Sequence, residues 1–171
     1  MARHMVYDVE VATTAAQLYA DFSGIEYWQA LAERYRSQSI NTEIAHFDRN
    51  PRGTDIVIAH RVASTDLPAM VRPLVPATFI LTRHQHFDPF APGTNQAAGH
   101  FRASVNNTRL DLHGDYLLAD TPTGCRMRLR SHCAVRLPLI GGQVEQLVVS
   151  GLKTLFRTES AFTDERIADH R

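Results

Sequence analysis

The hydrophobic pattern of this chain changes its period near the C-terminus, and that change constrains the fold more than any other feature. Between residues 124 and 137, polar and apolar side chains alternate, which is typical of an antiparallel strand with one buried face. Between residues 144 and 162, apolar side chains follow helical spacing, which predicts an amphipathic helix of about 25 residues. The apolar strand face and the apolar helix face must therefore cover each other.

Strand patterns also dominate the middle of the chain, and turn residues separate them. Capping boxes that begin at Thr14 and Ser23 predict two short helices after the first strand. The predicted strands before the last one are residues 4–12, 39–49, 54–63, 78–87, 96–105 and 108–119. This order predicts a single α+β domain over residues 1–171, in which a curved antiparallel sheet of about seven strands wraps around the long C-terminal helix.

Residues 66–76 interrupt the strand patterns with three prolines. Proline cannot donate to a sheet ladder, so the segment is expected to form a short helical turn or an apolar loop like a lid. The second short helix carries Tyr27, Trp28 and Leu31 at helical spacing. If the sheet curves around the long helix, a cavity is expected between them, with the aromatic helix and the proline-rich segment at its mouth.

Three stretches resemble a known superfamily. Residues 137–145 resemble the strand-to-helix junction of an uncharacterised bacterial branch of the START-like or SRPBCC superfamily, and Leu67-Pro68 and residues 79–87 are similar to the same branch. The resemblance implies the helix-grip fold and a hydrophobic ligand cavity, but it carries over no ligand and no catalytic residue. Phe87 stands where this branch often has tryptophan, so the cavity mouth is expected to differ.

Polar side chains on otherwise apolar strand faces are the candidate ligand anchors. They are His60, Arg83, Gln85, Tyr116 and Ser131. If Arg83 is buried, it needs a carboxylate or an anionic ligand group. Alternatively, Arg83 lies near a strand end and extends its charge into water.

These features favour binding, for carriage or sensing, of a hydrophobic small molecule such as a lipid, a fatty acid or a polyketide-like compound. The ligand is expected to lie in the internal cavity. Besides the polar anchors, the expected contact residues are Tyr27, Trp28, Leu31, Met70, Leu74, Phe101, Met127, Leu129, Leu152, Leu155 and Phe156.

Two other functions stay open. A cyclase- or dehydratase-like enzyme would act on a hydrophobic or aromatic substrate in the same cavity, with His60 and Tyr116 as the candidate acid–base pair. The spacing does not require catalysis, and the sequence has no phosphate loop, nucleophile elbow or metalloprotease motif. The third function is a non-enzymatic interaction protein whose cavity is filled by its own side chains.

Histidines recur on the polar faces of the later strands, at His84, His100, His113 and His132. With tight hairpins, His100 would face His113, and His113 would face His132. The same register would pair Arg102 with Asp111 and Arg130 with Asp115. Such a row would bind a divalent metal or gain charge below about pH 6.5, but a solvated face is the expectation, and we assign no metal or cofactor.

The charge balance and the absence of long apolar runs exclude several partners. The 18 Lys+Arg residues equal the 18 Asp+Glu residues, which argues against a nucleic-acid module. No apolar run approaches the roughly 18–20 residues of a membrane span, and the first residues lack the apolar block of a signal peptide. We therefore expect a cytoplasmic protein without stable membrane insertion, either a monomer or a weak homodimer.

Small residues in the last strand and helix have simple expected roles. Cys125 and Cys133 lie on one predicted strand, about 26 Å apart, which is too far for a disulfide. Gly151 costs about 1 kcal/mol relative to alanine in a helix. Close approach of the helix to the sheet would explain this glycine, and so would room for a ligand beneath the helix.

Overall fold

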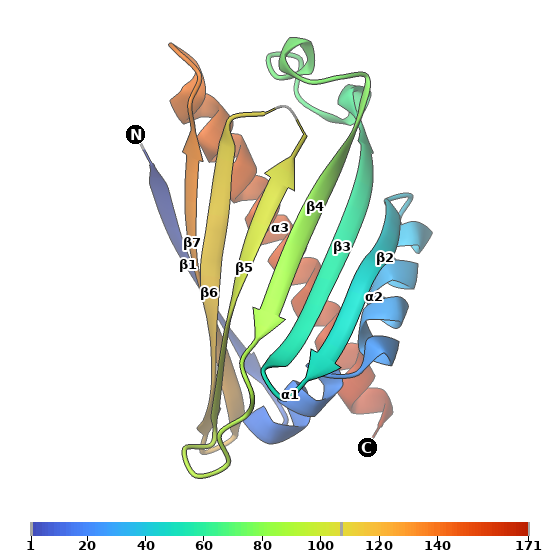
Figure 1. Ribbon diagram of the computed structural model, residues 1–171, viewed down its shortest axis with the longest axis vertical. Helices are drawn as coiled ribbons and strands as arrows, with labels where there is room; N and C mark the ends of the chain where they lie inside the picture. The colour runs from blue at the N-terminus through green and yellow to red at the C-terminus, as the bar shows by residue number, and fades with distance from the viewer. Residues whose placement is uncertain (1, 107, 171) are drawn as a thin grey trace.

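The computed structural model describes residues 2–106 and 108–170, which form one seven-stranded antiparallel sheet with three α-helices (Figure 1). The strand order is β1-β7-β6-β5-β4-β3-β2, so the first strand pairs with the last. The strands are β1 (Arg3–Val11), β2 (Asn41–Asn50), β3 (Gly53–Ala63), β4 (Thr78–Phe87), β5 (Gln96–Val105), β6 (Leu110–Thr121) and β7 (Gly124–Val135). All seven predicted strands are confirmed.

The helices confirm one predicted start signal and correct the other. Helix α1 (Ala15–Phe22) begins at Thr14, whose side-chain oxygen accepts the Gln17 N–H at 3.1 Å. The capping box at Ser23 is wrong, because Ser23 ends α1 by donating its N–H to the Tyr19 carbonyl at 2.9 Å. Helix α2 (Ile25–Ser37) therefore has Gly24 as its N-cap residue, and Gly24 provides no side-chain hydrogen bond to the helix.

Helix α3 (Gly141–Asp169) spans 29 residues and follows β7 through a tight junction. Buried Glu145 accepts the Val135 N–H at 2.9 Å, so its carboxylate joins the start of the helix to the end of the strand. The β3–β4 connection contains two short 3-10 helices, η1 (Ser64–Asp66) and η2 (Arg72–Leu74). The expected helical turn in the proline-rich segment is thus confirmed.

All three α-helices lie on one side of the sheet (Figure 1). Helix α3 packs against β1 and β7, and α2 packs against β2 at the other edge. Between these contacts, buried side chains fill the space over the middle strands. The sheet curved around one long helix is the predicted helix-grip architecture, and it is confirmed.

A glycine in β6 gives an aromatic side chain room on the inner sheet face. Gly114 lies opposite Phe101 of β5, which is 1% exposed. A Cβ atom at Gly114 would lie 2.1 Å from the Arg130 carbonyl oxygen and 2.5 Å from Cε1 of Phe101. The backbone and the ring therefore both occupy the space that a side chain at residue 114 would need.

Gly151 does not mark a close contact between the helix and the sheet. It is exposed on α3, and apart from its chain neighbours and the surrounding helix backbone, a Cβ atom there would meet no described atom within 4 Å. The close approach of helix to sheet is therefore wrong at this position. Open space lies beside Gly151, on the solvent side of the helix.

The register of the later strands confirms two predicted pairs and corrects two. Arg130 faces Asp115, and His113 faces His132, as expected. In the β5–β6 hairpin, however, His100 faces Asp115 and Arg102 faces His113. The reason is that the predicted tight turn is replaced by a longer connection, which shifts the register by two residues. Arg102 still lies 3.6 Å from Asp111, as a diagonal neighbour.

We predict opposite effects for two Gly→Ala substitutions. Gly114→Ala is expected to lower the free energy of unfolding by about 2 kcal/mol or more, because the added methyl group meets the Arg130 backbone and Phe101. Gly151→Ala is expected to raise the free energy of unfolding by about 0.5–1 kcal/mol, because alanine has a higher helix propensity than glycine and its methyl group meets no clash here. Urea unfolding of both variants measures these changes, and equal effects at the two sites would contradict the packing described here.

Candidate functional site

A buried ion pair lies between the middle of the sheet and α3. Arg83, in the middle of β4, is 2% exposed, and its guanidinium pairs with the Glu159 carboxylate of α3. The Tyr35 hydroxyl of α2 donates to the same carboxylate oxygen at 2.7 Å. The interpretation in which Arg83 reaches water from a strand end is therefore wrong. The required carboxylate is provided by the protein itself.

Several polar atoms on the inner sheet face have unused hydrogen-bonding capacity. Nε and Nη1 of Arg83 have no hydrogen-bond partner among the described residues. The same holds for Nε2 of His60, Oε1 of Gln85 and Oγ of Ser131. A buried polar group left without a partner costs about 1–3 kcal/mol. Such groups are rare, and several on one inner face indicate a place for a ligand or ordered water.

The histidine of this group is neutral at physiological pH. Burial lowers the pKa of His60 to about 4, and the nearby Arg83 charge contributes. Nδ1 of His60 lies 2.9 Å from the Thr42 hydroxyl oxygen, and that hydroxyl donates to the Ile40 carbonyl at 3.1 Å. Because a hydroxyl has one proton, the Thr42 oxygen accepts from Nδ1. The free Nε2 of neutral His60 therefore carries a lone pair.

A small cavity of about 20 Å³ lies between the sheet and the helices. Its volume is that of roughly one water molecule. It is lined by Phe22, Tyr27, Trp28, Gln85, Phe87, Tyr116, Met127, Leu129, Phe156, Glu159 and Thr163. The ring centroids of Phe22 and Phe87 are 5.2 Å apart, and those of Phe22 and Trp28 are 5.8 Å apart. Aromatic side chains thus fill most of the space that the sequence assigns to a ligand.

The structure brings together part of the predicted ligand set. Seven predicted residues line the small cavity: Tyr27, Trp28, Gln85, Tyr116, Met127, Leu129 and Phe156. Six more are buried in the surrounding core: Leu31, His60, Arg83, Phe101, Ser131 and Leu152. Leu155 is half-buried and packs against that core.

Met70 and Leu74 lie elsewhere. They are 41% and 39% exposed in the β3–β4 connection. That connection leads into β4 at Thr78, whereas the Trp28 ring packs against Phe87 at the other end of the same strand. Ten residues of strand separate these ends by about 30 Å. The aromatic helix and the proline-rich segment therefore do not form one cavity mouth.

The predicted ligand set lacks four of the lining residues, Phe22, Phe87, Glu159 and Thr163, although the resemblance placed Phe87 at the cavity mouth. Glu159 and Thr163 had a detectable signal, because Glu159 follows Phe156 by three residues and Thr163 follows Glu159 by four. This spacing places both on the buried face of α3. Thr163 also lies 2.8 Å from the Tyr27 hydroxyl, and burial raises the pKa of that phenol.

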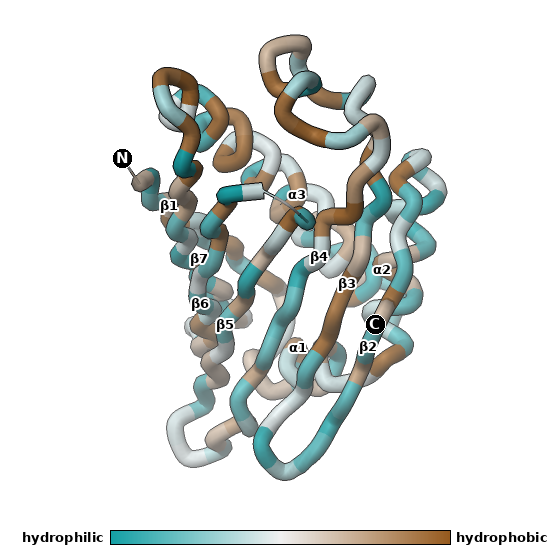
Figure 2. Tube along the Cα trace, turned by 45° about the horizontal axis from the view of Figure 1, so that its top comes forward, coloured by the Kyte–Doolittle hydropathy of each residue, from teal (hydrophilic) through white to brown (hydrophobic). Residues whose placement is uncertain are grey.

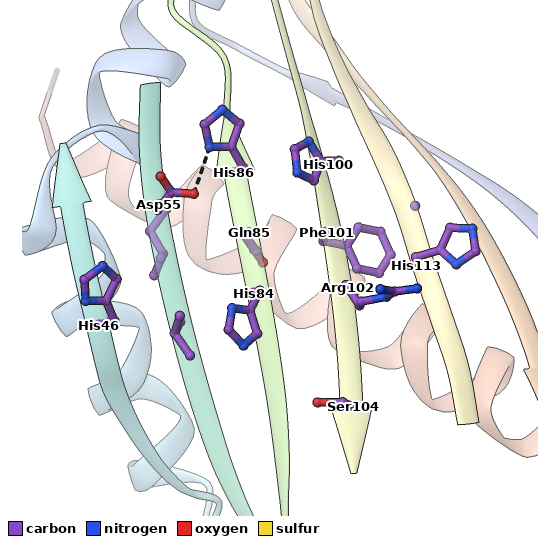
Figure 3. Close-up of a pocket in the computed structure, with 13 residues that line it drawn as sticks. His46, Asp55, His84, Gln85, His86, His100, Phe101, Arg102, Ser104 and His113 are labelled. Carbon is purple, nitrogen blue, oxygen red and sulfur yellow. Dashed lines mark hydrogen bonds and ion pairs between the residues drawn. The ribbon is translucent and has the colours of Figure 1, made fainter. Parts of the chain in front are cut away.

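A larger and more open hollow of about 1000 Å³ lies on the outer sheet face, opposite the helices (Figure 3). His86 has its Nδ1 2.8 Å from Asp55 and its Nε2 3.3 Å from Asp88, and its ring stacks on His100 with centroids 5.1 Å apart. The predicted histidine row is therefore split, because His100 lies beside His86 rather than in line with His113. Among residues 2–106 and 108–170, no three histidine, cysteine or acidic side chains are arranged to hold a metal ion.

Comparisons with known proteins agree with this geometry. The profile of a family described as "Protein of unknown function (DUF2505)" matches residues 6–167. An uncharacterised protein of Mycobacterium tuberculosis is 27% identical over 168 residues, which cover 95% of each chain. The solved structure of a START superfamily protein from Mycobacterium smegmatis is similar, with a TM-score of 0.53 and 14% identity over 95% of this chain and 97% of that chain.

A plant enzyme has the same fold. Norcoclaurine synthase from Thalictrum flavum, in complex with dopamine and hydroxybenzaldehyde, is similar with a TM-score of 0.57 and 11% identity. The match covers all of this chain and 89% of the enzyme. Likeness at this identity establishes the fold alone. The resemblance to the START-like superfamily is thereby confirmed at the level of the helix-grip fold.

We predict that His60 makes the protein sensitive to acid. Its pKa is about 4 when folded and near 6.5 otherwise, so below pH 6.5 the unfolded chain binds a proton that the folded protein does not. Above pH 6.5, burying neutral His60 costs the folded protein no stability. As the pH falls toward 4, protonation of the unfolded chain lowers the free energy of unfolding, by about 2 kcal/mol between pH 7 and 5.

The measurement is urea unfolding at pH 7 and pH 5. His60→Gln is expected to lose less stability over this interval than the unsubstituted protein. The matched control is His46→Gln, at an exposed position of β2, which is expected to retain the original pH dependence. An unchanged pH dependence in His60→Gln would contradict the assignment.

Proposed function

This chain belongs to the DUF2505 family of proteins of unknown function, and from its helix-grip fold and its buried polar group we propose that it binds a small hydrophobic molecule with one anionic or hydrogen-bond-accepting group. The observation that carries the proposal is the pair of Arg83 nitrogens, Nε and Nη1, that have no partner among the described residues. Folds of this type typically enclose hydrophobic ligands.

At Arg83, the electrostatics favour a ligand group that accepts hydrogen bonds. Arg83 is neutralised by Glu159 through one nitrogen only, so its remaining N–H groups can donate to a carboxylate, phenolate or carbonyl oxygen. Such charge-assisted bonds are about twice as strong as neutral ones. The apolar body of the ligand would replace contacts among Trp28, Met127 and Phe156, which line the small cavity.

Binding requires the cavity to enlarge, because ligand pockets usually measure roughly 300–1000 Å³. Helix α3 packs mainly on β1 and β7 at one edge of the sheet, and buried side chains fill the space over the middle strands. Rotation of Met127 and Phe156, which line the cavity together with Glu159, would open space beside the carboxylate that pairs with Arg83. We infer that the ligand enters by displacing these side chains.

We predict that an anionic aromatic probe and a neutral one distinguish this site. The probes are 1-anilinonaphthalene-8-sulfonate and N-phenyl-1-naphthylamine, and quenching of Trp28, the single tryptophan, reports binding. Arg83→Gln is expected to weaken binding of the sulfonate at least tenfold and to change binding of the neutral probe less than threefold. Glu159→Gln is expected to strengthen binding of the sulfonate severalfold, because Arg83 loses its competing carboxylate.

The matched control is Glu165→Gln, which removes an exposed carboxylate from the same helix. It is expected to leave both affinities unchanged, and near-UV circular dichroism checks that each variant is folded. Equal effects of Arg83→Gln on the two probes would contradict an anion anchor. If neither probe binds, the core is packed by its own side chains, as in an interaction protein, and the proposal fails.

The lone pair on Nε2 of His60 favours one second candidate, an enzyme that removes a proton next to a carbonyl group. The C–H bond breaks, the proton moves to Nε2, and the electron pair forms an enolate whose oxygen Arg83 would stabilise. The test is hydrogen–deuterium exchange of α-tetralone in D₂O, followed by NMR. Exchange that His60→Gln abolishes, while probe binding persists, supports the enzyme; exchange at the background rate rejects it.

A further inference from the structure

The large apolar side chains exposed to solvent gather at one end of the molecule. This upper end of Figure 1 is where β3, β5 and β7 finish, and it includes the connections 38–40, 64–77, 108–109 and 136–140. Of the six such side chains in the described part of the chain, four lie there: Ile40, Met70, Leu74 and Leu139. The other two, Val6 and Leu117, lie on the outer sheet face. Among the described residues, the connections at the lower end expose none.

Leu139 is the most unusual of the four. Its side chain is fully exposed, and its backbone has a φ of 69°, in the left-handed region that leucine rarely adopts. The Ile140 N–H donates to Pro138 at 2.9 Å, and the Gly141 N–H donates to Leu137 at 3.0 Å, so the turn is held by its own bonds. Backbone strain of this kind is concentrated at functional sites. Here it holds an apolar side chain out in water.

The charges of the upper end complement an anionic surface. Its connections carry three exposed arginines, Arg72, Arg109 and Arg136, and one acidic residue, Asp66. The Arg72 guanidinium donates to the carbonyls of Leu67 and Thr65 at 2.8 and 3.1 Å, which fixes the shape of the β3–β4 connection. Figure 2 shows hydrophobic stretches in that connection and in the β7–α3 junction, both at the same end.

We propose that the upper end docks on an anionic phospholipid bilayer. Leu139, Met70 and Leu74 would enter the boundary between headgroups and acyl chains, while the arginines would contact lipid phosphates. The four apolar side chains stand on three connections, with Met70 and Leu74 on the same one, and this arrangement suits insertion between lipids. No helix in the described part of the chain is long and apolar enough to cross a membrane. This docking goes beyond the proposed ligand binding and does not depend on it.

The test is cosedimentation of the full chain with sucrose-loaded vesicles. Vesicles of phosphatidylcholine with 30 mol% phosphatidylglycerol are expected to bind the protein at least tenfold more tightly than vesicles of phosphatidylcholine alone. Binding is expected to weaken as salt is raised. Equal binding to both vesicles, or no binding to either, would overturn the proposal.

Two substitutions separate docking from folding. Leu139→Gly removes the apolar side chain and suits the positive φ, so it is expected to preserve or raise the melting temperature while weakening vesicle binding about tenfold. Met70→Ser is expected to weaken vesicle binding severalfold. The matched control is Leu117→Ser, at a side chain as exposed as Met70, which is expected to bind vesicles like the unsubstituted protein.

Two results with these variants would contradict docking through the upper end. If Leu117→Ser weakens vesicle binding as much as Met70→Ser, the contact is not confined to the upper end and the proposal fails. If Leu139→Gly binds vesicles normally, the exposed leucine has no docking role and the proposal fails. Probe binding to the soluble protein tests the cavity without vesicles, so failure of docking and failure of ligand binding are distinguishable.

Discussion

The ion pair between Arg83 and Glu159 is the interaction on which the interior depends. A guanidinium in an apolar core requires a counter-charge, and that counter-charge is on the one helix that spans the sheet. Because α3 packs mainly on β1 and β7, the pair connects the helix to a strand in the middle of the sheet. Tyr35 adds α2 to the same carboxylate, so one acidic group orients the two helices over the sheet.

The same ion pair also bears on function. A charge that is fully satisfied by its neighbours would indicate structure alone, but Arg83 keeps two nitrogens unpartnered among the described residues, and neutral His60 keeps a free lone pair. The surrounding aromatic side chains leave room for about one water molecule. The polar groups are thus ready for a ligand whose apolar part must first displace side chains, and this couples ligand entry to motion in the core.

The sequence contained most of the architecture because a period of two and a period of 3.6 residues are local signals. It also identified Arg83, Gln85 and His60 as polar residues on buried strand faces. It did not identify Glu159 as the partner, because pairing depends on how α3 is rotated and placed above the sheet. The sequence did not predict the β5–β6 register correctly, because that register depends on the length of one turn. It did not predict the cavity volume, because that volume depends on side-chain rotamers. Local pattern predicts the elements, whereas tertiary contacts decide the site.

The pairing of β1 with β7 has a consequence for how the chain folds. Arg3 pairs with Cys133 and Val11 with Cys125, so β1 is synthesised more than 110 residues before the strand with which it pairs. Contacts this distant in sequence slow folding, since the entropy of closing a long loop must be lost before they form. The first strand would therefore be the last to enter the sheet, and a nascent chain would keep its apolar face exposed until β7 has left the ribosome.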